Sequence, residues 1–262
     1  MLKEFLPPIA LKYLSSFFYG WSGNYSSWQE AEKKCTGYDN ELIFNKVKDA
    51  LIKVKNGDAV FERDSVIFDK IYYSFPLLSA LSLTALDEKA TLKVLDFGGS
   101  LGSAYYQNKK LFTHLNDFTW NIVEQKHFVT EGKQTFADDH LNFYYTIDEC
   151  LKEQQINLLL LGSVLQYIEH PYQLLDEITK HQISHICIDR TPVFLTYSDR
   201  ITIQKVHKSI YDAQYPCWIL NETKLINYIC NKGYELVFEA ESSEKINLTD
   251  AHLKGYYFKL KN

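Results

Sequence analysis

The segment 92–102, which reads Leu-Lys-Val-Leu-Asp-Phe-Gly-Gly-Ser-Leu-Gly, restricts the possible folds more than any other part of the chain. Its alternating apolar residues predict a buried strand that ends at Asp96. Gly98, Gly99 and Gly102 then turn the chain toward a predicted helix. Glycine has no Cβ, so such a bend lets the backbone approach a ligand and points a helix N-terminus at it. The segment therefore predicts a ligand-binding α/β sheet.

Strand and helix patterns alternate along the rest of the chain. Apolar runs that suit strands fall at 120–124, 141–147, 157–162 and 185–189, and helical patterns fall at 125–136, 172–180 and 221–231. The last two predicted strands, 235–240 and 256–260, have no helix between them. This order predicts an α/β fold, a doubly wound and mostly parallel Rossmann-like sheet that ends in a C-terminal antiparallel hairpin.

Two parts of the chain are expected outside this sheet. Residues 1–58 predict an N-terminal helical and aromatic arm, and 59–262 predict the main domain. Within the main domain, 64–86 predicts one or two helices, and 191–220 is longer than a simple connection needs, which predicts a lid. An amphipathic pattern near the start of the arm predicts packing on the main domain or on a second subunit, as in a homodimer, rather than on a membrane surface.

Composition excludes several classes of protein. The net charge is −5 and no cluster of lysine and arginine carries interleaved aromatics, which argues against nucleic acid as the main partner. The five scattered cysteines include no CxxC pair, so we expect neither a metal site nor a disulfide framework, and a cytoplasmic location. Neither a signal peptide nor a transmembrane segment is predicted.

Two cofactor classes compete for the glycine bend. A nicotinamide dinucleotide and S-adenosylmethionine both call for an acid after the second strand, where Glu124 stands. The dinucleotide fingerprint is G-x-G-x-x-G, whereas this bend reads Asp96-x-Gly98-x-x-x-Gly102. The acid of the bend also suits an ammonium group and repels a pyrophosphate. The pattern therefore favours S-adenosylmethionine.

Several segments together resemble a known family of enzymes. They are 96–103, Tyr106-Gln107, Val123-Glu124-Gln125, 163–167, Asp189-Arg190-Thr191-Pro192, 62–65 and 215–218. They resemble class I S-adenosylmethionine-dependent methyltransferases, and more narrowly a poorly characterised bacterial family often encoded among O-antigen and capsule biosynthesis genes. The resemblance covers nearly the whole chain and implies S-adenosyl-L-methionine as the cofactor.

The resemblance also implies which residues hold that cofactor. Asp96 and the bend would surround the methionine part, Glu124 the ribose, and Gly162 the sulfonium. Arg63, in the charged segment 62–64, could grip a ligand carboxylate, the alternative being a solvated helix start. The full set of expected cofactor contacts is Asp96, Gly98, Gly99, Gly102, Glu124, Gln125, Ile147, Asp148 (the last two beside adenine), Gly162, Ser163 and Arg63.

Methyl transfer to an oxygen needs a base that takes the acceptor's proton. Asp189 is the main candidate, because it ends a buried strand at the ligand-binding edge; the alternative is a salt bridge to Arg190. Gln166 and Tyr167 stand where many small-molecule methyltransferases have an acid–histidine pair, and His170 follows three positions later. We expect Tyr167 to orient the acceptor and count His170 as a second candidate base.

The acceptor is expected to bind under the lid. Expected substrate contacts are Gln166, Arg190, Tyr211, Tyr215 and Trp218, whose flat faces and polar tips suit a sugar; an ordinary lid or dimer contact is the alternative. The sequence thus predicts O-methylation of a saccharide or nucleotide-sugar precursor of a bacterial surface glycan. N-methylation of an amino sugar or other small molecule, a nicotinamide-dependent oxidoreductase, a binding module without turnover and RNA methylation remain alternatives, the last disfavoured by charge.

Overall fold

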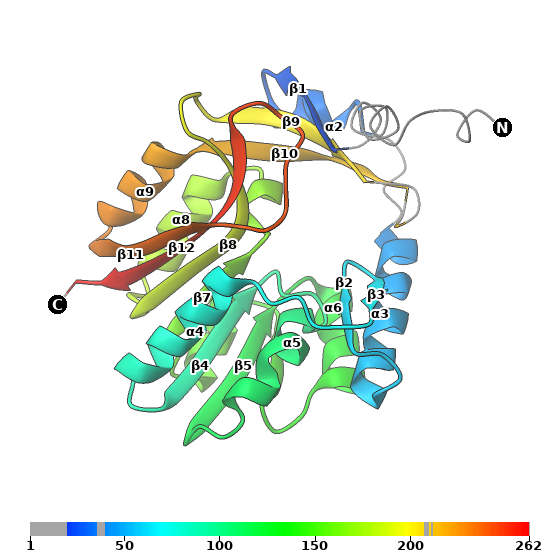
Figure 1. Cartoon of the computed structure of the whole chain (residues 1–262), viewed down its shortest axis with the longest axis vertical. Helices are drawn as coiled ribbons and strands as arrows, with labels where there is room; N and C mark the ends of the chain where they lie inside the picture. Colours follow the sequence, from blue (N-terminus) through cyan, green and yellow to red (C-terminus); the bar gives the residue numbers. More distant parts are fainter. Residues whose placement is uncertain (1–19, 36–39, 207–209, 211, 262) are drawn as a thin grey trace.

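The computed structural model describes residues 20–35, 40–206, 210 and 212–261. A mostly parallel sheet forms the centre of the described part of the chain, and helices cover both of its faces (Figure 1). The expected amphipathic segment before residue 20 lies outside the described residues. None of the described helices is long and apolar enough to cross a membrane.

The sheet follows the order expected for a doubly wound fold. Its parallel strands are β4 (Thr91–Phe97), β5 (Asp117–Val123), β6 (Leu141–Tyr144), β7 (Leu158–Gly162) and β8 (His185–Phe194), in the spatial order β6-β5-β4-β7-β8. The final hairpin joins this sheet at β8 through β12 (Ala251–Leu260), which runs antiparallel to β8 and to β11 (Tyr234–Glu241). The predicted fold class is therefore confirmed.

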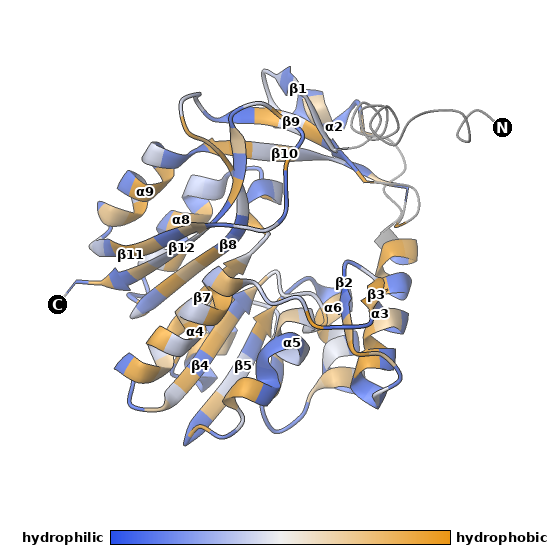
Figure 2. Cartoon of the chain, in the orientation of Figure 1, coloured by the Kyte–Doolittle hydropathy of each residue, from blue (hydrophilic) through white to orange (hydrophobic). Residues whose placement is uncertain are grey.

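Two hydrophobic clusters cover the two faces of the sheet. The helices are α4 (Phe75–Asp87), α5 (Ser103–Phe112), α6 (Lys126–Glu131) with a π-turn at Gly132–Phe136, α7 (Ile147–Glu153), α8 (Pro171–Thr179) and α9 (Glu222–Cys230). Helices α4 and α5 pack on one face through residues such as Leu81 and Tyr105, and α7 to α9 on the other through Leu175 and Leu225. Hydrophobic and hydrophilic residues alternate along α9, as expected for a helix with one buried side, whereas α4 is hydrophobic over most of its length (Figure 2).

The described part of the N-terminal arm is not wholly helical. Strand β1 (Gly20–Tyr25) precedes α2 (Trp28–Glu32) and α3 (Asn40–Asn56). Ser27 caps α2, since its hydroxyl accepts a hydrogen bond from the amide of Glu30 at 3.1 Å. The expected lid is a hairpin of β9 (Arg200–Lys205) and β10 (Gln214–Asn221), and β1 pairs with β9. Arm and lid therefore extend the main sheet.

A second difference concerns the segment that precedes α4. In place of a helix from residue 64, β2 (Phe61–Arg63) and β3 (Val66–Phe68) form a small hairpin. Asp64 and Ser65 make its turn with φ values of 51° and 67°. Two consecutive residues with a left-handed backbone match the twist of a tight hairpin. The helical spacing of the apolar residues concealed this turn in the sequence.

Gly132 tests the packing of the sheet against the π-turn. A Cβ at this position would lie 2.4 Å from the ring of Phe143, a buried residue of β6. We expect Gly132→Ala to lower the free energy of unfolding by about 1–3 kcal/mol, because a close-packed core resists added volume. Urea denaturation measures this change. Gln134→Ala, at an exposed position of the same turn, is the control and should stay within about 0.5 kcal/mol of the parent. Equal effects of the two substitutions would contradict the packing argument.

Candidate active site

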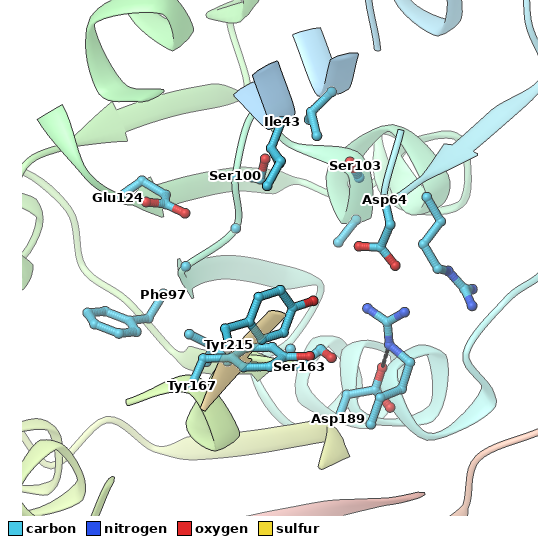
Figure 3. Close-up of a pocket in the computed structure, with 18 of the residues that line it drawn as sticks. Ile43, Asp64, Phe97, Ser100, Ser103, Glu124, Ser163, Tyr167, Asp189 and Tyr215 are labelled. Carbon is cyan, nitrogen blue, oxygen red and sulfur yellow. Dashed lines mark ion pairs between the residues drawn. The ribbon is translucent and has the colours of Figure 1, made fainter. Parts of the chain in front are cut away.

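A cavity of about 1310 Å³ opens where the ends of β4, β5 and β7 meet the middle of β8. Ligands of open α/β sheets bind at this carboxyl edge. The β2–β3 hairpin and α3 line one side of the cavity, and β9, β10 and Trp28 line another. Figure 3 shows side chains from these separate elements converging on the cavity. Segments far apart in the sequence therefore build one site.

The glycine bend lies above a buried acid. Asp96 is the second-last residue of β4, and its buried Oδ2 accepts a hydrogen bond of 2.9 Å from the indole nitrogen of Trp120. A Cβ on Gly99 would lie 2.6 Å from this carboxyl group, and one on Gly98 would lie 2.6 Å from Val164. Because these glycines have no Cβ, the bend packs directly on Asp96 and Val164. Gly98 and Gly99 also face the cavity. Gly102 instead caps α5 with φ 106° and does not line the cavity.

Three carboxyl groups surround the bend and all have raised pKa values. Burial raises the pKa of Asp96 to about 7 despite its bond to Trp120, and the charge of Glu124 adds to the effect. Burial also raises the pKa of Glu62 to about 7, although the hydroxyl of Ser103 donates to it. Glu124 has a pKa raised by burial. The carboxyl groups around the bend therefore favour binding of a cation, which would take the place of their protons.

The two residues expected beside adenine do not lie where the sequence predicts. Glu124 follows β5, accepts from the amide of Gln125 at 2.6 Å and lines the cavity, as does Gln125. Ile147 and Asp148, expected beside adenine, begin α7 because β6 ends three residues earlier. Ile147 packs on a core cluster, and the side chain of Asp148 is 76% exposed. Tyr145 lines the cavity in their place.

A bulge in β8 turns two consecutive residues toward the cavity. Tyr256 pairs with Ile188 and Lys254 with Thr191, so that Gly255 alone faces both Asp189 and Arg190. Arg190 has φ 51°. In a regular strand two neighbouring side chains point to opposite faces. The bulge removes this alternation, which is how Asp189 and Arg190 both line the cavity.

Asp189 is buried and held on two sides. The hydroxyl of Ser74 donates to its Oδ1 at 2.8 Å, and Nε of Arg190 lies 3.5 Å from its Oδ2 (Figure 3). Ser74 is the N-cap residue of α4, but its hydroxyl binds Asp189 and makes no cap hydrogen bond to the helix. Burial raises the pKa of Asp189, and Arg190 and the Ser74 hydroxyl oppose that rise. The carboxyl group is thus fixed in position beside the cavity.

Arg63 and Arg190 lie on the same side of the cavity. Arg63 donates to the carbonyl oxygen of Tyr72 at 3.0 Å and pairs with Glu244. Nη1 of Arg190 lies 3.7 Å from the same oxygen of Glu244. Burial and the charge of Arg190 lower the pKa of Arg63. In this structure the partner of Arg63 is therefore a carboxylate of its own chain.

The aromatic wall of the cavity is formed by two tyrosines. The rings of Tyr167 and Tyr215 meet edge to face at 5.1 Å, and the hydroxyl of Tyr167 donates to Oε1 of Gln204 at 2.8 Å. Figure 3 shows both rings beside Ser163. Trp218 lies behind this wall, stacked on Trp28 at 6.2 Å, so that Trp28 and not Trp218 lines the cavity.

Two further predicted residues do not line the cavity, and a third lies outside the described residues. Gln166 is buried and donates to the hydroxyl of Ser163 at 3.0 Å, so it supports Ser163 from behind. The side chain of His170 is 62% exposed and lies 3.9 Å from Glu169, outside the cavity lining. Tyr211 lies outside the described residues. Gly162 and Ser163, two of the expected cofactor contacts, line the cavity at the end of β7.

Sequence reasoning missed Ser74 and Tyr145 as members of this site. Ser74 precedes Pro76 and reads as a helix cap, which gives no sign of its bond to Asp189. Tyr145 would have been found by ending the third strand earlier, at the Thr146 cap of α7. Within the described ranges, no three histidine, cysteine, aspartate or glutamate side chains gather in a way that could hold a metal ion.

Comparison with known proteins gives matches at the level of structure. Neither a family model nor a curated protein sequence matches this chain. The N-terminal domain of EvdMO1, crystallised with S-adenosylhomocysteine (SAH) in the presence of D-fucose, matches with TM-score 0.51 and 11% identity over 86% of this chain and 98% of that one. Magnesium protoporphyrin IX methyltransferase (ChlM) from Synechocystis PCC 6803 matches with TM-score 0.47 and 10% identity over 71% and 78%. A Burkholderia thailandensis 1,6-didemethyltoxoflavin-N1-methyltransferase matches with TM-score 0.45 and 12% identity over 93% and 94%. The chain has the Rossmann-like fold of S-adenosylmethionine-dependent methyltransferases.

The bond from Ser74 to Asp189 leads to a prediction about stability. Ser74→Ala should lower the free energy of unfolding by about 1.5–3 kcal/mol when Asp189 is ionised, because a hydrogen bond to a buried charge is lost. The effect should shrink at acid pH, since protonation through the raised pKa of Asp189 removes that charge. Denaturation at about pH 4 and about pH 8 measures both values. Ser82→Ala, which removes a hydroxyl bond within the same helix, is the control and should show no such pH dependence. An equal loss at both pH values for Ser74→Ala would contradict the assignment.

Proposed function

We propose that this protein is an S-adenosylmethionine-dependent methyltransferase. The observation that carries the proposal is the open glycine bend, with buried Asp96 beneath it, Glu124 across it and a cavity large enough for a nucleoside beside it. The residues present fit this cofactor: carboxyl groups suit its ammonium and ribose groups, and they would repel a diphosphate. The fold shared with EvdMO1, which was crystallised with SAH, supports the same assignment.

The ribose, base, ammonium and sulfonium groups of the cofactor each have a proposed counterpart in the cavity. Glu124 would accept from the ribose hydroxyls, and Tyr145 and Gln125 would flank the base. Asp96 would hold the ammonium group, assisted by Glu62 on the other side of the bend. When bound, the cofactor supplies a methyl group on a sulfonium, ready for in-line displacement. The chain's own contribution is to fix this group next to Gly162 and Ser163.

Asp189 is the proposed general base for an oxygen acceptor. It lines the cavity next to Ser163, whose amide donates to the carbonyl of Asp189 at 2.8 Å. Its raised pKa makes it a better proton acceptor than an ordinary exposed carboxylate. Ser74 and Arg190 fix its orientation. His170, exposed and outside the cavity lining, is not assigned this role.

The proposed acceptor is a saccharide, such as a nucleotide sugar or a precursor of a surface glycan. Tyr167, Tyr215 and Trp28 offer aromatic faces to the cavity, and Gln204 and Gln214 add polar groups. Such a wall suits the C–H faces and hydroxyls of a sugar ring. The fragment of EvdMO1 with the same fold was crystallised in the presence of D-fucose, which supports a sugar as the first class of acceptor to test.

Cofactor binding should depend on pH. Because Asp96 and Glu62 have pKa values of about 7, binding of a ligand ammonium group below that pH must release a proton. We expect the affinity for SAH to rise by up to about tenfold per pH unit until about pH 7 and then to level off. Isothermal titration calorimetry in buffers of different ionisation enthalpy measures both the affinity and the released protons.

Asp96→Asn is the matched variant for this measurement. It should weaken SAH binding by about tenfold or more and reduce the slope with pH, because one ionisable partner is gone. Glu177→Gln, which removes an acid at an exposed position of α8 outside the cavity lining, serves as the control. Binding of NADH in place of SAH would reject the proposed function in favour of an oxidoreductase.

Turnover tests the role of Asp189. The protein is incubated with a labelled methyl donor and a panel of nucleotide sugars, amino sugars and surface-glycan extracts. With an oxygen acceptor, Asp189→Asn should lower the rate by about 10²–10⁴-fold and leave SAH affinity within about twofold. His170→Ala should not change the rate, since this side chain is exposed outside the cavity lining. Full activity of Asp189→Asn would remove Asp189 as the base, and transfer only to a protein or only to an amine would end the O-methylated saccharide proposal.

A further inference from the structure

We infer that the methyl acceptor carries a carboxylate, and that Arg63 and Arg190 bind it in the place that Glu244 now takes. The inference rests on the proposed methyltransferase function and goes beyond it by naming the charge of the acceptor. The substrate class is then an acidic saccharide of the uronic acid type.

Two cations from distant parts of the chain meet at this side of the cavity. Arg63 ends β2 and Arg190 lies in the bulge of β8, and both line the cavity. Their charges repel, and the pKa of Arg63 is lowered by burial and by Arg190. Placing two guanidinium groups together is unfavourable unless an anion lies between them. The pair therefore predicts an anionic occupant.

In this structure the occupant is Glu244. One of its carboxylate oxygens contacts Nη1 of Arg63 and lies 3.7 Å from Nη1 of Arg190. Glu244 belongs to the turn 242–250 that joins β11 to β12. Its contacts show that a carboxylate fits between the two arginines. Glu244 does not itself line the cavity, so it reaches the two arginines from outside the cavity wall.

The exposure of the three side chains indicates which of them is exchangeable. The side chains of Arg63 and Arg190 are 22% and 21% exposed, whereas that of Glu244 is 42% exposed. Glu244 is the most exposed of the three and belongs to a turn, so a ligand that offers a better-placed carboxylate can displace it. The arginines are fixed parts of the wall, and Glu244 is a replaceable partner.

The arginines also have donors left to offer. Nε of Arg190 is buried and has no hydrogen-bond partner within the described part of the chain, the nearest oxygen of Asp189 being 3.5 Å away. Guanidinium groups present a planar fork of donors that matches a carboxylate in two parallel hydrogen bonds. Because this Nε is covered and faces Asp189, a ligand carboxylate would meet the Nη atoms, which Glu244 contacts with a single oxygen.

The remaining charges near the pair set the orientation of the acceptor. Asp189 and Asp64 both act on the charge of Arg190, together with Glu244. Asp189 is the residue next to Arg190 and is the proposed base. A carboxylate held by the arginines would be kept apart from the Asp189 carboxylate by repulsion. The hydroxyl groups of the acceptor would then face Asp189 and the methyl donor.

The test compares matched acidic, amide and neutral sugars on the SAH-saturated protein at constant ionic strength. Saturation-transfer NMR measures binding of D-glucuronate, D-glucuronamide and D-glucose, and the same three forms of galactose. We expect each acid to bind at least about tenfold more tightly than its amide and neutral forms. Glu244→Gln should improve binding of the acids by about three- to tenfold and leave the neutral sugars unchanged. Arg63→Met should remove the preference for the acids.

Glu241→Gln is the matched control, because it removes one negative charge three residues away, where Glu241 pairs with His252 at 3.0 Å. It should not change the binding of any of the sugars. Two results would overturn the inference. One is equal binding of acids and amides by the parent protein, or equal effects of the two glutamate substitutions. The other is loss of SAH binding in Arg63→Met with unchanged binding of decarboxylated SAH, which would assign the arginines to the cofactor's own carboxylate. Failure of the parent protein to bind SAH at all would instead reject the proposed function.

Discussion

The hydrogen bond from Trp120 to Asp96 is the interaction on which the cofactor side of the site depends. It holds a buried acid under a glycine bend, where a bulkier residue at Gly99 would collide with the carboxyl group. A buried carboxyl group with one donor is only partly satisfied, and its raised pKa records that deficit. Below about pH 7 the carboxyl group of Asp96 is therefore mainly protonated in the free protein, and binding of a cation would favour the carboxylate. The same arrangement thus supports the fold and prepares the site.

On the acceptor side, the equivalent constraint is the bulge in β8. It places Asp189 and Arg190 on one side of the strand, at the expense of a left-handed backbone at Arg190. Gly255 makes this possible, because a Cβ there would lie 2.5 Å from Pro76 and 3.2 Å from Asp189. The start of α4 is thereby pressed close to β12, which brings Ser74 within reach of Asp189. One irregular pairing thus assembles the proposed base and its two supports.

The sequence predicted those features that depend on local patterns and missed those that depend on long-range pairing. The order of strands and helices, the glycine bend and the acid at Glu124 follow from apolar periodicity and chain direction. The β2–β3 hairpin and the early start of α7 were missed, because helical spacing and a strand end are ambiguous over a few residues. Trp218 was assigned to the acceptor but lies behind Trp28, since a pattern does not give the side from which a ring is covered. The bulge has no local signal at all, as it arises only when β12 pairs with β8.

The acidic and the basic side chains of the cavity lie in separate regions. Acids gather at the bend, where Asp96, Glu62 and Glu124 lie, and two arginines gather beyond Asp189. A cofactor with a sulfonium and an ammonium group matches the first region, and it would repel a cationic acceptor from the methyl group. An acceptor with its negative charge at the arginines meets the opposite field and is drawn past the methyl donor in one orientation. Until then Glu244 pairs with both arginines, in addition to the pair that Arg190 makes with Asp189. This separation of charges provides a physical reason for both proposed ligands. The acidic region suits the cofactor, and the two arginines suit the acceptor.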